Sequence, residues 1–231
     1  QKDDFVSSVS HELRTPITSI IGFAEELQES ATPDQQQASD IIVRNAQRLT
    51  EMVEQLLEIG RMTAPNPLRE ARTIDLTTIV RDAMEEQSGI AHKRDVTMND
   101  RLSADPTPVI ASTNTAGRIS TNLLSNAIKF SPPGGTVEIS TASDGTVVTL
   151  VVDDSGPGVS DSDLPHVFER FFRSDDAEKR LTPGTGLGLS IVRSLVQSHD
   201  GDIAITRSPL GGARVVVTLP AAFEGMTRIP E

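Results

Sequence analysis

Apolar residues return every three or four positions across residues 1–62, and this spacing predicts two amphipathic helices joined by a turn at residues 30–34. The second helix has a spacing close to a heptad seam. Two helices alone bury too little apolar surface, so we expect the hairpin to dimerise into a four-helix bundle. The first stripe consists of Phe5, Val9, Leu13, Ile17, Ile20, Ala24 and Leu27, and the second of Ile42, Ala46, Leu49, Val53 and Leu56.

The pattern changes after residue 62, where Pro65 and Pro67 indicate a linker. Short alternating runs then predict strands mixed with helices. Because the two do not alternate regularly, the second region is predicted to be an α+β sandwich. We expect a hairpin domain at 1–64, a linker at 65–71, a second domain at 72–220 and a tail at 221–231. Strands are predicted at 74–76, 96–98, 109–111, 136–141, 146–152, 202–206 and 213–219, and helices at 77–93, 115–130 and 187–198.

Composition narrows the functional classes. The chain contains no Cys, which excludes disulfides and thiolate metal sites. Its formal net charge of −12 argues against a nucleic-acid partner, and the absence of Trp and Tyr removes the usual base-stacking side chains. No run approaches the roughly 20 apolar residues that span a bilayer.

One segment of the first helix carries candidate chemistry. At about 100° per residue, His11 points away from the apolar stripe and is predicted to be exposed. Glu12 places a carboxylate beside it, and Thr15 lies on the same helix face four residues later. His11 is therefore a candidate reactive imidazole rather than a core histidine.

Two polar clusters in the second domain suggest a ligand site. Asn122 and Asn126 share a helix face, their amide oxygens suit Mg²⁺, and Lys129 adds a cation for phosphate. Asp154 ends an apolar strand before Gly156 and Gly158, where a carboxylate could accept an adenine amine. The alternatives are a solvated helix face for the first cluster and a simple tight turn for the second.

Two further clusters follow along the chain. Phe168–Arg173 combines aromatic residues with Arg170 and Arg173, which could reach phosphate, although an ordinary amphipathic helix is the alternative. Gly184–Leu189 opens an apolar helix with small residues, an arrangement that binds anions through free N–H groups. Its spacing matches neither a dinucleotide fingerprint nor a P-loop. The order of all the clusters favours a nucleotide site.

Together these segments resemble the sensor histidine kinases of two-component systems. Phe5–Pro16 resembles the H box of a dimerisation and phosphotransfer domain. Asn122–Phe130, Asp154–Gly158, Phe168–Phe172 and Gly184–Leu189 resemble the N, G1, F and G2 boxes of the catalytic domain. The resemblance implies a Bergerat-type α/β sandwich that binds ATP and Mg²⁺, a homodimer formed through the hairpin, and a response-regulator receiver domain as partner. It also implies the cytoplasmic part of a sensor anchored in the membrane through a region N-terminal to this chain.

The resemblance also implies roles for individual residues. His11 would accept the phosphoryl group, Glu12 would hold its tautomer, and Thr15 would align water during regulator dephosphorylation. Asn126 would ligate Mg²⁺ and Asp154 would bind the adenine amine. The remaining nucleotide-site positions are Asn122, Lys129, Phe130, Gly156, Gly158, Arg170, Arg173, Gly184, Thr185, Gly186, Leu187, Gly188 and Leu189.

Three functional hypotheses remain open from the sequence. The first is ATP-dependent autophosphorylation of His11 followed by transfer to a regulator aspartate. The second is a protein that mainly dephosphorylates its regulator through Thr15. The third is a non-enzymatic dimerisation module with a nucleotide sensor, or a relative of the chaperone-type ATPases, and the H box argues against the latter relationship.

Overall fold

The computed structural model describes residues 71–173 and 185–222, together with eleven helical positions between residues 17 and 46. The chain divides into two compact units, one of residues 1–65 and 183–187, the other of residues 66–182 and 188–231. We describe each unit by itself. The helical positions of the first unit are Ile17, Thr18, Ile20, Ile21, Gly22, Ala24, Gln35, Ser39, Ile42, Val43 and Ala46.

The described positions of the first unit bury part of each predicted apolar stripe. Ile17 and Ala46 form a buried cluster with the partly buried Ile21. The Ser39 hydroxyl donates a hydrogen bond to the Ala24 carbonyl, which ties the two helical stretches together at a second point. Ile20 and Ile42 remain 46% and 43% exposed in the single chain. Large exposed aliphatic residues on a helical pair are the feature that association with a second hairpin would bury.

The second unit contains a five-stranded sheet with the order β2-β4-β5-β7-β6 and a two-stranded sheet of β1 and β3. β2 runs parallel to β4, and the remaining neighbours are antiparallel. The strands are β1 (Arg72–Asp75), β2 (Thr97–Arg101), β3 (Pro108–Ala111), β4 (Thr136–Ser143), β5 (Val147–Asp154), β6 (Asp202–Arg207) and β7 (Ala213–Pro220), and the helices are α3 (Leu76–Lys93), α4 (Thr113–Phe130) and α6 (Gly188–Gln197). Each predicted strand and helix is present, with small shifts at the ends.

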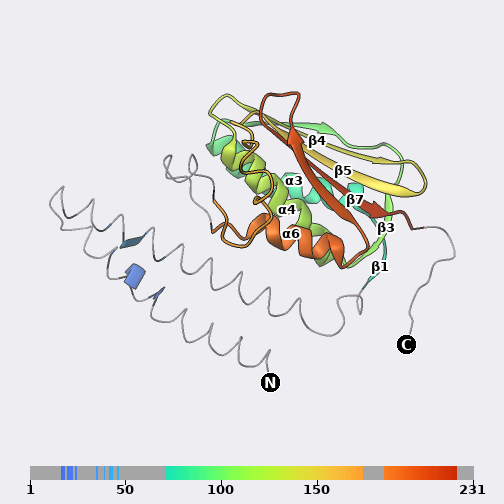
Figure 1. The fold of residues 1–231 in the computed structure, drawn as a ribbon, viewed down its shortest axis with the longest axis horizontal. Coiled ribbons are helices and arrows are strands. Elements are labelled where there is room, and N and C mark those ends of the chain that lie inside the picture. Colours follow the sequence, from blue (N-terminus) through green and yellow to red (C-terminus); the bar gives the residue numbers. More distant parts are fainter. Residues whose placement is uncertain are drawn as a thin grey trace, which may run out of the picture. The chain divides into compact units, whose positions relative to one another are not determined.

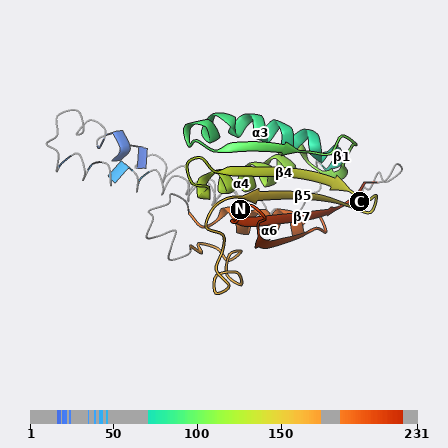
Figure 2. The ribbon, with the colours of Figure 1, turned by 90° about the horizontal axis from the view of Figure 1, so that it is seen from above.

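The helices lie along one face of the large sheet, so the unit has two layers (Figure 1, Figure 2). α4 packs on β4 and β5, and α6 packs on β6 and β7. The core lies between the layers and follows the two periodicities that the sequence shows, 3.6 in the helices and 2 in the strands. Its fully buried residues include Leu123, Leu124, Ile128, Ile139, Leu150, Ile191, Val192 and Val217. The α+β class predicted from the sequence is therefore confirmed.

Hydrogen bonds from Thr78 and Thr107 hold the carboxylate of Asp75, the residue before α3. Asp75 precedes α3, and its Oδ1 accepts hydrogen bonds from the Thr107 N–H at 2.8 Å and the Thr107 hydroxyl at 3.0 Å. Its Oδ2 accepts from the Thr78 hydroxyl at 2.7 Å. Burial alone would raise the pKa of the Asp75 carboxyl, but these hydrogen bonds outweigh burial and lower it.

The C-terminal boundary needs a correction. The sequence places residues 221–231 in a tail, yet Ala221 and Ala222 are buried. The Ala221 N–H donates to the Thr146 carbonyl at 2.9 Å, and the Ala222 N–H donates to the Pro108 carbonyl at 2.7 Å. The backbone therefore continues past β7 and pairs with β3, because two small side chains fit there. Residues 223–231 lie outside the described part.

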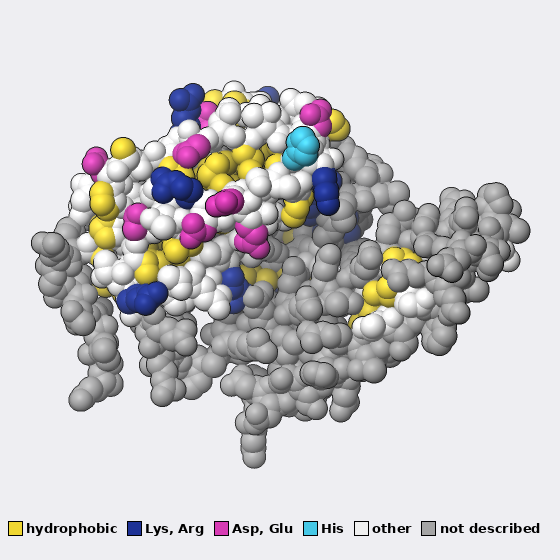
Figure 3. All heavy atoms as spheres, turned by 180° about the vertical axis from the view of Figure 1, so that it is seen from behind, with side chains coloured by type: hydrophobic (Ala, Val, Ile, Leu, Met, Phe, Trp, Pro, Cys, Tyr) yellow, Lys and Arg dark blue, Asp and Glu magenta, His cyan; other side chains and the backbone are white. Residues whose placement is uncertain are grey.

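The surface of the described region is mixed in charge. On the side opposite Figure 1, acidic and basic side chains are interspersed around visible hydrophobic ones (Figure 3). Within the described residues, no helix has the length and hydropathy needed to cross a membrane.

Candidate functional site

The polar stripe of α4 faces the beginning of α6. The Asn122 side-chain amide donates to the Arg118 carbonyl at 2.9 Å, which orients the Asn122 side chain along the helix. A Cβ atom added at Gly188 would lie 3.1 Å from Asn122 Oδ1 and 3.4 Å from Asn126 Nδ2. A side chain at residue 188 would therefore be in tight contact with both asparagine amides, and glycine leaves them in place. Two clusters that are 62 residues apart in sequence, counted from Asn126 to Gly188, therefore meet.

Asp154 ends β5 on the side of the sheet that the helices cover. Its Oδ1 accepts hydrogen bonds from the Gly156 N–H at 2.8 Å and the Ala213 N–H at 3.1 Å. The residue is only 8% exposed. Burial raises the pKa of the Asp154 carboxyl, against the lowering effect of the two N–H groups. No basic side chain bonds this carboxylate among the described residues, and a carboxylate of this kind suits a neutral donor such as an exocyclic amine.

Glycines let the backbone pack closely around Asp154. A Cβ at Gly156 would lie 2.8 Å from the Phe130 carbonyl oxygen, so only glycine lets this turn pack against the end of α4. A Cβ at Gly212 would overlap Asp154 Oδ1. Gly158 has a φ of +75°, a left-handed conformation that favours glycine. The turn after β5, the end of α4 and the start of β7 thus converge on one carboxylate.

The end of α4 carries a cation and an aromatic ring. The Lys129 ammonium lies 4.5 Å from the centre of the Phe130 ring, within the range of a cation–π contact. Arg94 donates to the Ile128 carbonyl at 3.3 Å and to the Lys129 carbonyl at 2.8 Å. These bonds satisfy carbonyls that a helix leaves open at its C-terminus, and they fix the backbone that carries Lys129.

Residues 161–173 form successive turns, so the amphipathic-helix alternative for Phe168–Arg173 is wrong. Phe171 has a φ of 65°, a left-handed conformation that interrupts any helix. Arg170 is exposed and Arg173 is half-buried. The Phe168 ring lies against the Arg193 guanidinium of α6, which connects this segment to the helix that begins beside Asn122 and Asn126.

The residues predicted to open α6 are described only in part. Thr185 and Leu187 are buried, and the Leu187 N–H donates to the Thr185 hydroxyl at 3.4 Å. Gly186 has a φ of +75°. Leu189 is half-buried within α6. Gly184 lies outside the described residues, as do His11, Glu12 and Thr15.

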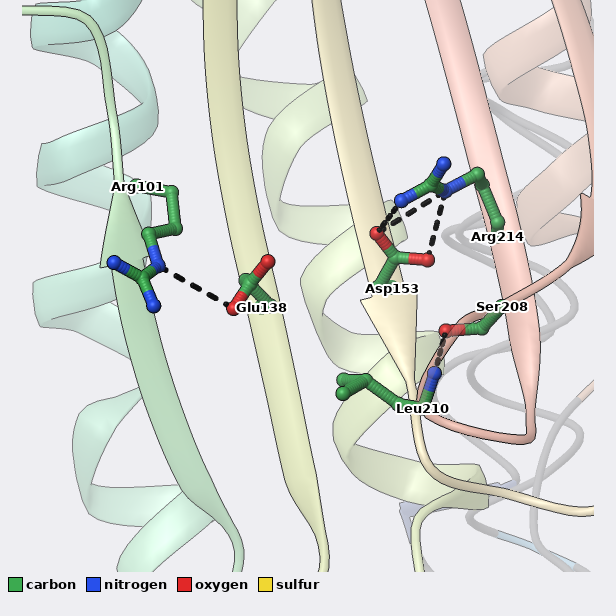
Figure 4. Close-up of polar contacts among 6 residues, drawn as sticks. All are labelled: Arg101, Glu138, Asp153, Ser208, Leu210 and Arg214. Carbon is green, nitrogen blue, oxygen red and sulfur yellow. Dashed lines mark hydrogen bonds and ion pairs between the residues drawn. The ribbon is translucent and has the colours of Figure 1, made fainter.

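Sequence reasoning missed several residues of this region. Gly212 could have been flagged, because the pair Gly211-Gly212 directly precedes a predicted strand. Arg193 looked like one more polar residue on a surface helix. The ion pair of Asp153 with Arg214 gave no local signal, since the two residues meet only through the pairing of β5 with β7 (Figure 4).

The fit of a divalent cation can be judged from the donor set. Among the described residues, no group of three His, Asp or Glu side chains could hold a metal ion. Asn126, by contrast, has no hydrogen bond to its side-chain amide within the described residues, so its oxygen can serve as a ligand. A single amide oxygen suits Mg²⁺ that is held mainly by phosphates and water. The residues present therefore fit Mg²⁺ that arrives with a nucleotide.

Comparison with protein families gives two matches, one in each of the two units. Residues 112–222 match the family "Histidine kinase-, DNA gyrase B-, and HSP90-like ATPase". Residues 1–65 match the "His Kinase A (phospho-acceptor) domain". The fold of the second unit is therefore that of this ATPase family.

Individual proteins agree with these matches. The sensor-like histidine kinase SenX3 of Mycobacterium tuberculosis is 35% identical over 229 residues, covering 96% of this chain and 54% of SenX3. The solved mycobacterial sensor histidine kinase MprB is 32% identical with a TM-score of 0.57, covering 65% of this chain and 97% of that structure. Full-length ShkA in complex with AMPPNP is 25% identical with a TM-score of 0.73, covering 96% of this chain and 47% of ShkA.

The chain belongs to the sensor histidine kinases of two-component systems. It spans about half the length of SenX3, since it covers 54% of that protein. The family predicted from the five sequence boxes is thus confirmed, while the roles of the individual residues stay predictions.

Proposed function

We propose that this chain is the kinase core of a dimeric sensor histidine kinase, which transfers the γ-phosphoryl group of ATP to His11 and then to an aspartate of a response regulator. The convergence of Asn122, Asn126 and Gly188 in one unit carries the proposal. The match of residues 1–65 to a phospho-acceptor domain supplies the acceptor.

The arrangement supports one orientation of the nucleotide. The adenine amine would donate to Asp154, whose carboxylate accepts, within the described part of the chain, hydrogen bonds from backbone N–H groups alone. The phosphates would then extend along α4 toward the N-terminus of α6, because the N-terminal end of a helix favours anions. Lys129 and Arg170 would add positive charge in a protein whose net charge is −12. The remaining site positions would line this path.

Asn126 would hold Mg²⁺ through its amide oxygen, and the ion would neutralise charge on the phosphates. In the transfer, the bond from the γ-phosphorus to the β,γ-bridging oxygen breaks and ADP leaves. A phosphorus–nitrogen bond forms at the His11 imidazole, and the other ring nitrogen passes its proton to Glu12 or to water. Glu12 would hold the tautomer that leaves the attacking nitrogen unprotonated.

The family to which the chain belongs motivates three further parts of the proposal. The hairpin would dimerise through faces such as that of Ile20 and Ile42, which are 46% and 43% exposed in the single chain. The receiver domain would approach the helix that carries His11. A membrane anchor N-terminal to this chain would complete the sensor.

The decisive experiment incubates the chain with γ-labelled ATP and Mg²⁺. We expect label that is stable to base and labile to acid, as a phosphoramidate is, and that His11→Gln removes. Asp154→Asn should lower the labelling through weaker ATP binding. If a folded, ATP-binding protein acquires no label that depends on His11, the proposal is wrong and a non-enzymatic nucleotide sensor takes its place.

Phosphatase activity is a second candidate, motivated by the hydroxyl of Thr15 four residues after His11. Thr15→Ala should leave autophosphorylation intact and abolish dephosphorylation of a cognate regulator. Thr15→Ser, which keeps the hydroxyl, should retain part of that activity. Equal dephosphorylation by the Thr15→Ala variant and the wild type would exclude this role.

A further inference from the structure

We propose that Arg193 is a positioning residue for phosphoryl transfer, because it stacks on Phe168 and so holds the segment Phe168–Arg173 against α6. The inference rests on the proposed function. It adds a residue of α6 that makes no direct contact with the nucleotide in that proposal, and it assigns this residue to the placement of Arg170.

The contact itself has the geometry of a cation–π pair. The Arg193 guanidinium carbon lies 5.4 Å from the centre of the Phe168 ring. Such pairs are attractive when the cation lies within about 6 Å of the ring centroid. Arg193 is exposed and Phe168 is half-buried, whereas Ile191, Val192 and Leu195 of the same helix face the core. Arg193 thus uses the outer side of a helix whose inner side is anchored in the core.

α6 contacts two parts of the site at once. It begins at Gly188, whose backbone lies beside Asn122 and Asn126. Five residues later, Arg193 reaches the aromatic segment. Because a helix packed on a sheet moves as a rigid element, the separation between the asparagines and Phe168 is set by α6. Because Arg170 follows Phe168 by two residues, its position relative to the asparagines also depends on α6.

The aromatic segment depends on side-chain contacts for its shape. Phe171 takes a φ of 65°, a conformation that L-residues avoid, and its side chain is 55% exposed. Contacts on either side hold the chain in this shape. The His166 Nδ1 atom lies 2.8 Å from Glu169 Oε1, and the His166 and Phe172 rings lie 5.9 Å apart. These contacts join residues 166–172 to one another, whereas the Arg193–Phe168 pair joins this stretch to α6.

A kinetic test separates positioning from general stability. In the full chain, Arg193→Met removes the charge but keeps an unbranched side chain, and Arg193→Lys keeps a cation. Arg81→Met makes the same change at an exposed arginine of α3 and is the matched control. We expect Arg193→Met to lower the kcat of autophosphorylation about two- to fivefold, the factor that an exposed cation–π pair supplies, with little change in KM for ATP. Arg193→Lys, which keeps a cation, should retain most of the wild-type kcat.

A spectroscopic test does not need catalysis. The chain has no Trp or Tyr, so Phe168→Trp introduces a single fluorophore, and Trp is the strongest cation–π partner. Acrylamide should quench the fluorescence of this Trp more strongly in the Arg193→Met background than in the wild-type or Arg81→Met backgrounds. Equal accessibility in all three would show that Arg193 does not cover residue 168 and would overturn the inference.

A double-mutant cycle completes the design. Arg193→Met and Phe168→Leu should lower kcat by similar factors, and the double variant should be no slower than the slower single variant. Additive losses would mean that the two residues act separately, and the inference would then be wrong.

Thermal denaturation of each variant identifies any loss of folding, and Arg193→Lys keeps the test meaningful if Arg193→Met unfolds. If wild-type protein neither binds ATP nor labels His11, the proposed function fails instead, while the quenching result still tests the contact.

Discussion

The two faces of the large sheet surround carboxylates with different partners, as two consecutive residues of β5 show. Asp153 points to the uncovered face, where Arg214 donates to both of its oxygens at 2.8–3.2 Å (Figure 4). Asp154 points to the face that the helices cover, and two backbone N–H groups bond one of its oxygens. The first carboxylate is satisfied within the protein, whereas the second keeps capacity for a ligand.

This difference separates structural charge from functional charge. A buried carboxylate with an arginine partner has its charge compensated on folding. A buried carboxylate without a cation destabilises the folded protein unless something binds it, and such groups are concentrated at functional sites. Successive side chains of a β-strand point to opposite faces of the sheet, so β5 can carry a structural carboxylate on one face and a functional carboxylate on the other. The functional one lies where β5 ends.

The largest effect should come from Asp154→Asn. The change replaces an acceptor by a donor opposite the adenine amine and removes a charge-assisted hydrogen bond. We expect ATP affinity to fall by about ten- to 150-fold, the factor that corresponds to about 1.5–3 kcal/mol. Isothermal titration with ATP and Mg²⁺ measures it. Asp153→Asn is the matched control, and a comparable loss in that variant would remove the functional distinction between the two residues.

Asp153→Asn should act on stability instead. It weakens a pair in which the carboxylate is buried and the arginine is partly exposed, so solvent screens part of the interaction. We expect about 1–2 kcal/mol of destabilisation, between the values for buried charged hydrogen bonds and for surface pairs. Urea unfolding measures it as a lower midpoint with an unchanged slope. An unchanged midpoint would show that the bidentate pair contributes nothing net.

A smaller effect concerns pH, where Asp154 and Asp75 should behave oppositely in the absence of nucleotide. Burial raises the pKa of Asp154, so the folded protein binds the proton more tightly and loses stability as pH rises through that pKa. Near neutral pH, Asp154→Asn should therefore stabilise the nucleotide-free protein, and this gain should shrink on acidification.

For Asp75, hydrogen bonding outweighs burial and lowers the pKa. Its contribution is present above the ordinary aspartate pKa of about 3.9 and disappears as pH falls below it. Asp75→Asn should therefore destabilise the protein near neutral pH, and the difference from wild type should narrow in acid. Thermal denaturation from about pH 2.5 to pH 7.5 tests both signs, and changes of the same sign in the two variants would contradict the assignment.

Much of this site could be predicted because its signals are local. Asn122 and Asn126 share a helix face by spacing alone, and Asp154 is marked by an apolar strand that ends before two glycines. The turn at Asp144-Gly145 is equally local, since Asp144 Oδ1 accepts from the Thr146 and Val147 N–H groups, both at 2.8 Å. Patterns of this kind need no knowledge of tertiary structure.

The features that sequence reasoning missed all depend on long-range register. Gly212 faces Asp154, and Asp153 faces Arg214, because β5 and β7 pair antiparallel in one register. Arg193 meets Phe168 across separate elements, and the left-handed Phe171 converts an apparently helical pattern into turns. A single sequence contains no local trace of the pairing of Asp153 with Arg214 or of Phe168 with Arg193, because these partners meet only in the folded chain.

The smallest effect should come from the second ion pair on the uncovered face. Arg101 Nε lies 3.4 Å from Glu138 Oε2, and the two side chains are 68% and 33% exposed (Figure 4). Water screens such a pair, and ordering the long arginine side chain offsets much of the gain, so Arg101→Met should change stability by less than about 0.5 kcal/mol. Urea unfolding at low and high salt measures it. A loss as large as that of Asp153→Asn would mean that exposure does not distinguish the two pairs, and that the charges of this face act as one network.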